Sequence, residues 1–290
     1  MKVCGFTIVR NALKYDYPVV ESITSILPLC DEFIVLVGKS DDNTLDLIRS
    51  IDSSKISIHE SVWDDTLKEG GQVLAVETNK AFDLIPDDAD WAFYLQADEV
   101  VHEKYHKAIR ESMLQWLTHT EVEGLLFNYT HFYGTYQYLG DSRRWYRNEI
   151  RIVRNDRAIR SYRDAQGFRK QGQKLKVKPI DAHIFHYGYV KSPQTMQTKM
   201  LDFHKLWHDE EWIRKNFRME ELFDFSQIDS LAEFRDTHPA VMNHRIKDVN
   251  WTIQLETGKK NLGFKDRILY FIEKITGHRL FEYKNYSLLR

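Results

Sequence analysis

The sequence predicts an α/β protein with a mostly parallel central sheet, a mixed second half of that sheet and a C-terminal helical extension. Strand-like and helix-like segments alternate as far as residue 117, as they do in successive βαβ units. The predicted strands are almost uninterrupted apolar runs, which is typical of parallel strands covered by helices on both faces. Polar segments follow three of these strands, and ligands of such sheets bind beyond the carboxyl ends of the strands.

The first half contains four predicted strands separated by helices. The strands are residues 3–9, 32–38, 55–62 and 91–97, and the helices are 17–27, 44–51, 70–85 and 102–117. Pro18 lies near the first turn of the first helix, where its missing N–H is not needed. The polar stretch "SDDNT" supplies capping residues for the second helix, and Pro86 ends the third.

The second half lacks this alternation. Residues 124–134 and 148–156 look like strands with no helix between them, which predicts mixed or antiparallel pairing. The glycine-bearing, basic stretch 161–179 is expected to be a surface loop or flap, and 182–190 a last strand. From Ser192 the chain is expected to be mostly helical, which predicts a domain of residues 1–208 and a helical extension of 209–290 packed on it.

Bulk properties bound the class of protein. The 290 residues suit one large domain with an appendage, and the net charge of −2 gives no reason to expect a nucleic-acid partner. Cys4 and Cys30 are too few for a disulfide framework or a zinc site. No segment approaches the roughly 18 apolar residues of a membrane span. We therefore expect a cytoplasmic protein, which could act at the inner face of the membrane.

Three polar segments are expected at one edge of the predicted sheet. They are "VRN" after the first strand, "GKSDD" after the second and "QADE" after the fourth. Because the carboxyl ends of parallel strands meet at one edge, these segments should converge. The last segment ends a buried strand on two acids, Asp98 and Glu99, which suggests a use for carboxylates at this edge.

The order of "IVRNALKY", "CDEFIVLVGKSDDNTLDLI" and "DADWAFYLQADEVV" resembles the bacterial family 2 glycosyltransferases, which have a GT-A fold. The resemblance covers residues 2–100 well and 120–190 loosely. It implies transfer of a hexose, with inversion, from a UDP, GDP or dTDP sugar to a saccharide or lipid-linked acceptor in polysaccharide biosynthesis. It also implies a divalent metal, Mn²⁺ or Mg²⁺, on the donor diphosphate, where a hard cation offsets the growing negative charge.

The resemblance also assigns residues to the nucleotide-sugar. These are Val9, Arg10, Asn11, Lys39, Asp41, Asp42, Gly71, Gln72, Asn79, Gln96 and Ala97. Asp41 and Asp42 have an alternative role as caps of the following helix. Asn79 matches the second member of an Arg-Asn pair in the family, and Thr78 stands where the family has the arginine.

The same resemblance proposes metal ligands. Asp98 matches the last acid of the family's Asp-x-Asp motif, whereas Gln96 stands at the first and is a poorer ligand for a hard cation. His183 and His186 are three residues apart in a predicted strand, so at most one of them faces the site. His186 is the chosen ligand because "HYGY" is similar to the family's H-x-G-Y segment.

An inverting transfer needs a base for the acceptor hydroxyl. Asp164 on the predicted flap is the candidate, with Glu149 as the alternative. The arginines of 141–156, Arg151 among them, either bind a diphosphate or anionic acceptor or pair with nearby acids. The basic, apolar helix that begins at Phe264 either packs on the domain or makes peripheral contact with anionic lipid.

Two other functions remain open. One is a degenerate, non-catalytic GT-A protein that binds sugar or nucleotide, which Gln96 and Thr78 favour. The other is a sugar-phosphate nucleotidyltransferase, which has a related core. The segment "VRNALKY" after the first strand contains no glycine, and this argues against the phosphate loop that a nucleotidyltransferase needs.

Overall fold

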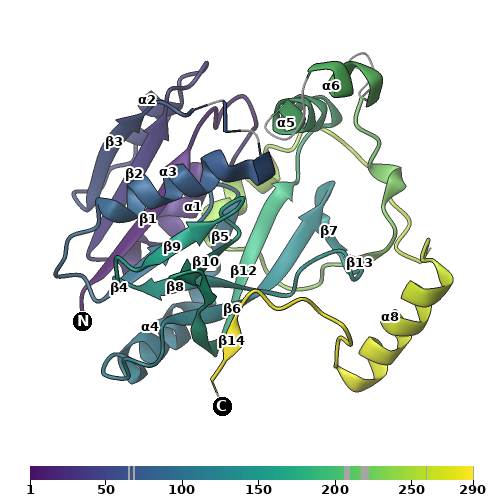
Figure 1. The fold of residues 1–290 in the computed structure, drawn as a ribbon. Coiled ribbons are helices and arrows are strands. Elements are labelled where there is room, and N and C mark those ends of the chain that lie inside the picture. The colour runs from purple at the N-terminus through teal and green to yellow at the C-terminus, as the bar shows by residue number, and fades with distance from the viewer. Residues whose placement is uncertain (65, 68, 206–209, 217–221, 259, 290) are drawn as a thin grey trace.

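The computed structural model describes residues 1–290 except 65, 68, 206–209, 217–221, 259 and 290 (Figure 1). An eleven-stranded sheet forms the centre of the molecule, and helices cover its first half on both faces. A small antiparallel sheet of three strands lies beside it. This is the mixed α/β class that the sequence predicts.

The first half of the sheet is parallel, as predicted. Strand β1 is central and pairs with β2 on one side and β4 on the other, and β3 pairs with β2. The strands are β1 (Val3–Val9), β2 (Glu32–Gly38), β3 (Ile56–Ser61) and β4 (Trp91–Tyr94), and the helices are α1 (Val19–Ile26), α2 (Thr44–Arg49), α3 (Gln72–Asp83) and α4 (His106–Gln115). Each predicted element of this half is confirmed within a few residues.

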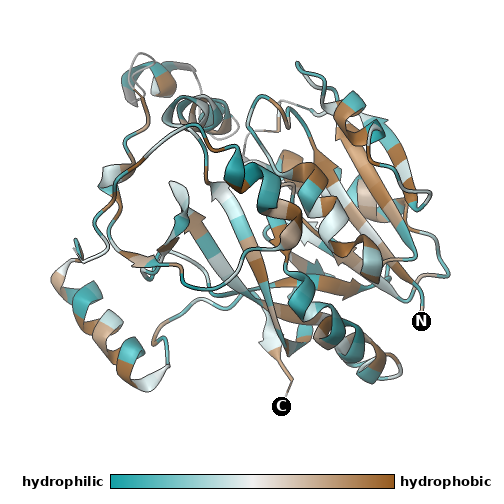
Figure 2. Ribbon diagram, turned by 180° about the vertical axis from the view of Figure 1, so that it is seen from behind, coloured by the Kyte–Doolittle hydropathy of each residue, from teal (hydrophilic) through white to brown (hydrophobic). Residues whose placement is uncertain are grey.

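Alternation along the strands divides the apolar side chains between two cores. In β2, Phe33, Val35 and Val37 join the core under α1, α2 and α4, whereas Ile34 and Leu36 join the core under α3. Successive side chains of a strand point to opposite faces, so a strand buried on both sides must be apolar throughout. Figure 2 shows these strands as mostly hydrophobic bands.

The second half of the sheet is mixed, as predicted, but it has more strands than the sequence suggested. Strand β8 runs antiparallel to both β4 and β6, and the long strand β12 runs parallel to β6. The strands are β5 (Glu99–Val101), β6 (Gly124–Tyr133), β7 (Thr135–Gly140), β8 (Asn148–Arg154), β12 (Lys176–Tyr189), β13 (Leu231–Glu233) and β14 (Ser287–Leu288).

The expected surface flap at 161–179 is wrong for most of its length. Strands β9 (Ile159–Tyr162), β10 (Gly167–Lys170) and β11 (Gln173–Lys174) form the small sheet, and β12 already begins at Lys176. Phe168 and Leu175 are buried in the core under α3, which fixes this segment. The sequence did not predict these short strands, because their few apolar residues are scattered among charged ones. Which of those residues is buried depends on partners far away in the chain.

Among the described residues of the C-terminal part are four α-helices, two short 3-10 helices and irregular chain. The α-helices are α5 (Pro193–Lys205), α6 (Glu210–Asn216), α7 (Asn243–Lys247) and α8 (Phe264–Thr276). The predicted boundary at 208 lies outside the described residues. Strands β13 and β14 pair with β7 and β12, so the extension is not only helical. Within the described chain, no helix has both the length and the apolar character needed to cross a bilayer.

The predicted helix at Phe264 is confirmed as α8, but the expectation that its apolar face packs on the core is wrong. None of its residues is buried, and it stands apart from the main sheet in Figures 1 and 2.

Candidate functional site

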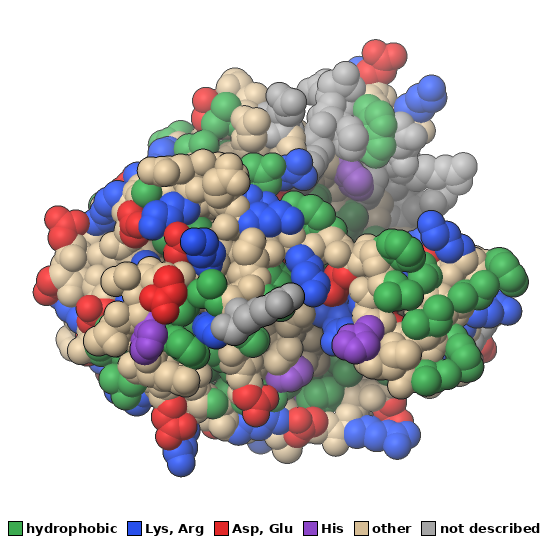
Figure 3. All heavy atoms as spheres, turned by 60° about the horizontal axis from the view of Figure 1, so that its bottom comes forward, with side chains coloured by type: hydrophobic (Ala, Val, Ile, Leu, Met, Phe, Trp, Pro, Cys, Tyr) green, Lys and Arg blue, Asp and Glu red, His purple; other side chains and the backbone are tan. Residues whose placement is uncertain are grey.

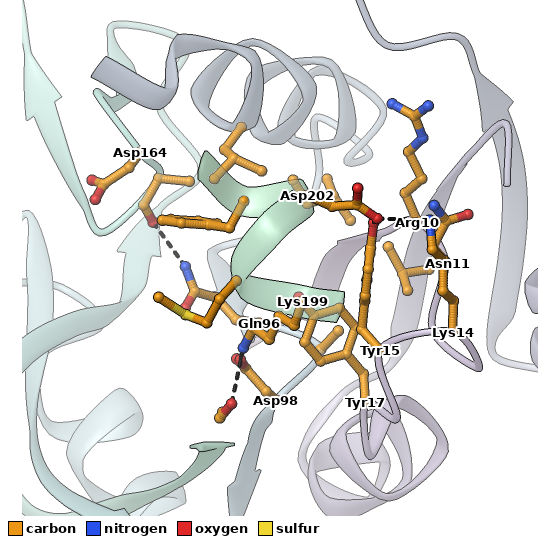
Figure 4. A pocket seen from close by; sticks show the side chains of 18 of the residues that line it. Arg10, Asn11, Lys14, Tyr15, Tyr17, Gln96, Asp98, Asp164, Lys199 and Asp202 are labelled. Carbon is orange, nitrogen blue, oxygen red and sulfur yellow. Dashed lines mark hydrogen bonds and ion pairs between the residues drawn. The ribbon is translucent and has the colours of Figure 1, made fainter. Parts of the chain in front are cut away.

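A pocket of about 680 Å³ opens beyond the carboxyl ends of β1 and β4, with α5 forming part of its wall (Figure 4). Several predicted site residues line it together. They are Val9, Arg10, Asn11, Asp41, Gln96, Ala97, Asp98, Asp164 and His186. The three polar segments therefore converge at one edge of the sheet, as parallel strands require.

The segments after β1 and β2 are joined by a pair of side-chain contacts. The Oδ1 atom of Asn11 accepts a hydrogen bond from the backbone N–H of Asp41 at 2.7 Å, and its Nδ2 donates to the Asp41 carboxylate at 3.3 Å. Asn11 has a φ of 57°, in the left-handed region that asparagine tolerates better than most residues. The turn at Asn11 thus holds the Asp41 carboxylate at the wall of the pocket.

An aromatic side chain accompanies the predicted arginine. The guanidinium carbon of Arg10 lies 5.6 Å from the ring centre of Trp63, and both residues line the pocket. A guanidinium and an indole together offer flat surfaces suited to a nucleobase. Trp63 was missed from the sequence because it follows a strand, β3, whose end carries no recognised motif.

The other predicted nucleotide-binding residues do not line the pocket, and local structure explains each of them. Lys39 and Gln72 are exposed. Asp42 accepts from the backbone N–H groups of Thr44 at 3.0 Å and Lys14 at 2.7 Å, while the N-cap of α2 is Asn43, whose side chain makes no capping hydrogen bond. Gly71 begins α3 with a φ of 70°. Asn79 binds the backbone N–H of Ser161 at 2.8 Å and so ties α3 to β9.

Asp98 and His186 face each other across a narrow gap. The Oδ2 atom of Asp98 lies 3.7 Å from Nε2 of His186. A Cβ atom on Gly188 would lie 2.6 Å from His186 Nε2 and 2.7 Å from Asp98 Oδ2. Glycine in "HYGY" therefore keeps a space open between the two predicted metal ligands. We call the gap bounded by Asp98, His186 and Gly188 the cation cradle.

A buried histidine fixes the tautomer of His186. Nε2 of His131 lies 2.8 Å from the carbonyl oxygen of Tyr146, so this nitrogen must carry the proton. Burial, and next the neighbouring His186, hold the pKa of His131 well below its usual value, so its ring is neutral. Its Nδ1 then accepts from Nδ1–H of His186 at 3.1 Å. With its Nδ1 directed to His131, His186 has Nε2 as the ring nitrogen that faces the cradle.

The cradle already holds a positive group. The ammonium of Lys199, on α5, lies 3.3 Å from Asp98 Oδ2 and donates to the carbonyl of Gly188 at 3.0 Å (Figure 4). Burial alone would raise the pKa of Asp98, but the positive charge of Lys199 outweighs it, and that pKa lies well below the usual range. The carboxylate is therefore ionised at neutral pH, and it faces a cation.

Asp98 Oδ2 and His186 Nε2 are the two donors that a divalent cation would meet in the cradle. These oxygen and nitrogen atoms face a space that a side chain at position 188 would fill. The ammonium of Lys199 now supplies the positive charge beside Asp98. Gln96 also lines the pocket, and its Nε2 donates to the carbonyl of Ala165 at 3.4 Å. The described part of the chain offers no group of three His, Cys, Asp or Glu residues placed to hold a metal ion.

Glu99, next to Asp98, has a different environment. Both of its oxygens bind the Arg151 guanidinium at 2.8 Å, and the two side chains are fully buried. Tyr129 donates to Glu99 at 2.7 Å, and Arg151 also donates to the carbonyl of Gln166. Burial opposes ionisation of Arg151, but Glu99 raises its pKa well above the usual value. Of the two roles predicted for Arg151, pairing with an acid is confirmed.

The two candidate bases lie in different places. Asp164 lines the pocket from the turn between β9 and β10, on the side away from Arg10 and Asn11 (Figure 4). Glu149 is buried in β8 and does not line the pocket. Burial raises the pKa of Glu149 to about 7, although the positive charge of Arg151 opposes this shift.

Helix α5 contributes residues that no motif predicted. The hydroxyl of Tyr15 donates to Asp202 at 3.0 Å, and Lys14 pairs with the same carboxylate at 2.7 Å. These contacts fasten α5 to the loop after β1 across the pocket, and so position Lys199. No local pattern predicted this, because the contacts join segments almost 190 residues apart.

No family model matches the chain, and no curated protein sequence matches it. The solved structures similar to it include S. aureus TarS, 4-diphosphocytidyl-2C-methyl-D-erythritolsynthase from Anaerococcus prevotii, and glucosyl-3-phosphoglycerate synthase from Mycobacterium tuberculosis in complex with Mn²⁺, UDP and phosphoglyceric acid.

The identities are 13%, 11% and 16%, and the TM-scores are 0.39, 0.40 and 0.30, in the same order. The matches cover 70%, 70% and 45% of this chain, and 39%, 94% and 43% of the respective structures. The chain thus spans well under half of TarS. Because each TM-score is below 0.5, the case for a function rests on the chain's own pocket.

Proposed function

We propose that this chain is a glycosyltransferase of the family 2 type, which transfers a hexose with inversion from a nucleoside-diphosphate sugar to a hydroxyl acceptor. The observation that carries the proposal is the single pocket that joins Asp41 and Arg10 to the cation cradle. One end offers partners for a nucleoside and the other offers a place for the charge of a diphosphate. A UDP sugar is the donor we expect first, and an acceptor from polysaccharide biosynthesis the first acceptor class.

In this proposal the residues divide the work along the pocket. The nucleobase of the donor lies against Arg10 and Trp63. The Asp41 carboxylate accepts hydrogen bonds from the ribose or the nucleobase. Asp98 and His186 hold Mn²⁺ or Mg²⁺, whose charge stabilises the departing diphosphate when it is bound. His131 keeps the Nε2 lone pair of His186 directed at the cradle. Lys199 is close enough to the cradle to pair with a phosphate oxygen.

The acceptor hydroxyl loses its proton as the new bond forms, so a base must lie on the acceptor side. We assign this role to Asp164, because it lines the pocket opposite the nucleoside residues. Glu149 is the weaker candidate, because it is buried outside the pocket.

Ligand-induced stabilisation tests the proposal. UDP, GDP and dTDP are added with and without Mn²⁺, and the unfolding temperature is measured. A nucleotide at a hundredfold excess over its Kd stabilises the native state by about 2.7 kcal/mol. We expect this stabilisation with nucleotide plus Mn²⁺, and its loss in Asp98→Asn. The matched control is Asp87→Asn, an exposed aspartate outside the pocket.

The absence of any shift with all three nucleotides would contradict the proposal. A shift without hydrolysis or transfer from any nucleotide-sugar would instead identify a binding-only protein. Release of pyrophosphate from a nucleoside triphosphate and a sugar phosphate would identify a nucleotidyltransferase. The anomeric configuration of the product, read by NMR, then tests inversion.

A further inference from the structure

Helix α8 exposes a continuous apolar stripe. Phe264, Ile268, Phe271 and Ile275 are 83%, 46%, 64% and 68% exposed. Their spacing of four, three and four residues places them on one face of the helix. Amphipathic helices of globular proteins normally bury this face, so its exposure needs an explanation.

The polar side of α8 fixes this orientation. The hydroxyl of Tyr270 donates to Asp141 at 2.8 Å. Glu273 binds Arg143 at 3.0 Å and Arg279 at 2.9 Å. Glu273 and Tyr270 lie roughly opposite the apolar stripe at about 100° per residue. The helix is therefore anchored through its polar side, with the apolar stripe turned away from the domain.

The turn after α8 extends the apolar surface. Leu280, Phe281 and Tyr283 are exposed, and Phe281 is 90% exposed. The φ of Phe281 is 59°, a left-handed conformation that is unfavourable for a bulky residue. Figure 3 shows the hydrophobic side chains gathered over this part of the molecule. We define the lipid-facing surface as the four stripe residues together with Leu280, Phe281 and Tyr283.

Positive charge surrounds this surface. Lys265, Arg267 and Lys284 are exposed, as is Lys274, whose ammonium lies 3.9 Å from Asp141, whereas Asp266 is the exposed acid of α8. Glu273 is turned inward and neutralised by arginines. The exposed side chains around the apolar surface thus carry a net positive charge, which complements anionic groups.

We propose that the lipid-facing surface binds peripherally to a bilayer that carries anionic headgroups. The apolar stripe enters the interface, and the lysines and arginine meet the headgroups. A second copy of this chain fits less well, because it would bring two basic margins together. This proposal is independent of the proposed enzymatic function, and the binding assay below requires no nucleotide.

Co-sedimentation with vesicles tests the proposal on the full chain. We expect binding to phosphatidylcholine vesicles that contain phosphatidylglycerol, and much weaker binding to phosphatidylcholine alone. Each of Lys265→Gln and Lys274→Gln should weaken binding to the anionic vesicles about fivefold. The double variant Phe271→Glu with Ile275→Glu should abolish it. The matched control, Leu114→Glu on α4, changes an exposed leucine away from the surface and should bind like the unmodified chain.

The variants change exposed side chains, so their thermal unfolding should be unchanged, and this measurement separates lost binding from lost folding. Failure to sediment with either kind of vesicle would overturn the proposal. So would undiminished binding of the Phe271→Glu, Ile275→Glu variant. A dimer in sedimentation velocity that this double variant dissociates would also overturn it, by identifying the surface as an interface between copies.

Discussion

Two adjacent acids, Asp98 and Glu99, end in opposite environments. Glu99 is sealed in the core, where Arg151, Tyr129 and a backbone N–H satisfy both of its oxygens. Asp98 lies at the pocket, where its partners are a lysine from a distant helix and a histidine 3.7 Å away. The side chains of Glu99 and Arg151 are fully buried, whereas Asp98 borders a space kept open by a glycine.

The difference teaches how one segment serves both structure and chemistry. A buried charge must be fully paired, since an unpaired one costs several kcal/mol. The Glu99 pair meets this demand and joins β5 to β8 beneath the pocket. Asp98 is then free to keep an incomplete set of partners, which is the condition that a ligand site requires.

Breaking the buried pair should have the largest effect. We expect Arg151→Met to lower the free energy of unfolding by about 3–5 kcal/mol, because Glu99 is left charged and buried. The double variant Glu99→Leu with Arg151→Met should recover much of this loss, since no charge remains unpaired. Urea denaturation measures both. The variant Lys199→Met removes the partner of Asp98 at the pocket. If Arg151→Met is no less stable than Lys199→Met, the two acids do not differ in their need for a charged partner.

Glu149 provides a pH test of the same buried region. Burial raises its pKa from 4.5 in the unfolded chain to about 7 in the folded protein. The folded state therefore binds the proton of Glu149 more tightly than the unfolded state does. The contribution of Glu149 to the free energy of unfolding is fully present below pH 4.5 and is lost as the pH rises to about 7. The full effect is about 3 kcal/mol.

The variant Glu149→Gln should remove this part of the pH dependence, as measured by denaturation at a series of pH values. If the variant and the unmodified chain lose stability in parallel between pH 4.5 and 7, the buried carboxyl does not behave as described. Retained transfer activity in Glu149→Gln would also agree with the assignment of the base to Asp164.

The smallest expected effect concerns the cation cradle. Lys199 places a positive charge 3.3 Å from Asp98 Oδ2, so an incoming cation is repelled until this ammonium moves. We expect Lys199→Met to bind Mn²⁺ about tenfold more tightly in the absence of nucleotide, because that repulsion is removed. Isothermal titration calorimetry measures the affinity without any activity assay.

The matched control for this experiment is Lys205→Met. Lys205 also lines the pocket from α5, but it pairs with Asp202 at 2.6 Å. This variant should leave the Mn²⁺ affinity unchanged. An unchanged or weaker affinity in Lys199→Met would show that Lys199 does not compete for the cradle.

Much of the first half could be predicted from the sequence. The strands from β1 to β4 are long apolar runs separated by capped helices, and both signals are local. Convergence of the polar segments followed from parallel pairing alone. This reasoning placed Asp98 at the edge, whereas the family resemblance supplied His186 and the need for a base supplied Asp164; all three line one pocket.

Other features depend on partners far apart in the chain. The pairing of Glu99 with Arg151 and of Asp98 with Lys199 links residues 52 and 101 positions apart. Lys39 and Asn79 matched a family pattern by position, but their side chains point elsewhere in this fold. Position in a motif does not set the direction of a side chain, which packing decides.

The sequence by itself determined the α/β class, the edge of the sheet that carries the site and the amphipathic character of α8, because periodicity and strand ends are encoded locally. Only the tertiary structure decided which adjacent acid is buried, which lysine enters the cradle and which face of α8 meets solvent. The physical reason is that burial and charge pairing depend on three-dimensional neighbours. Those neighbours bring together β4, β8, β12 and α5, which local patterns cannot place relative to one another.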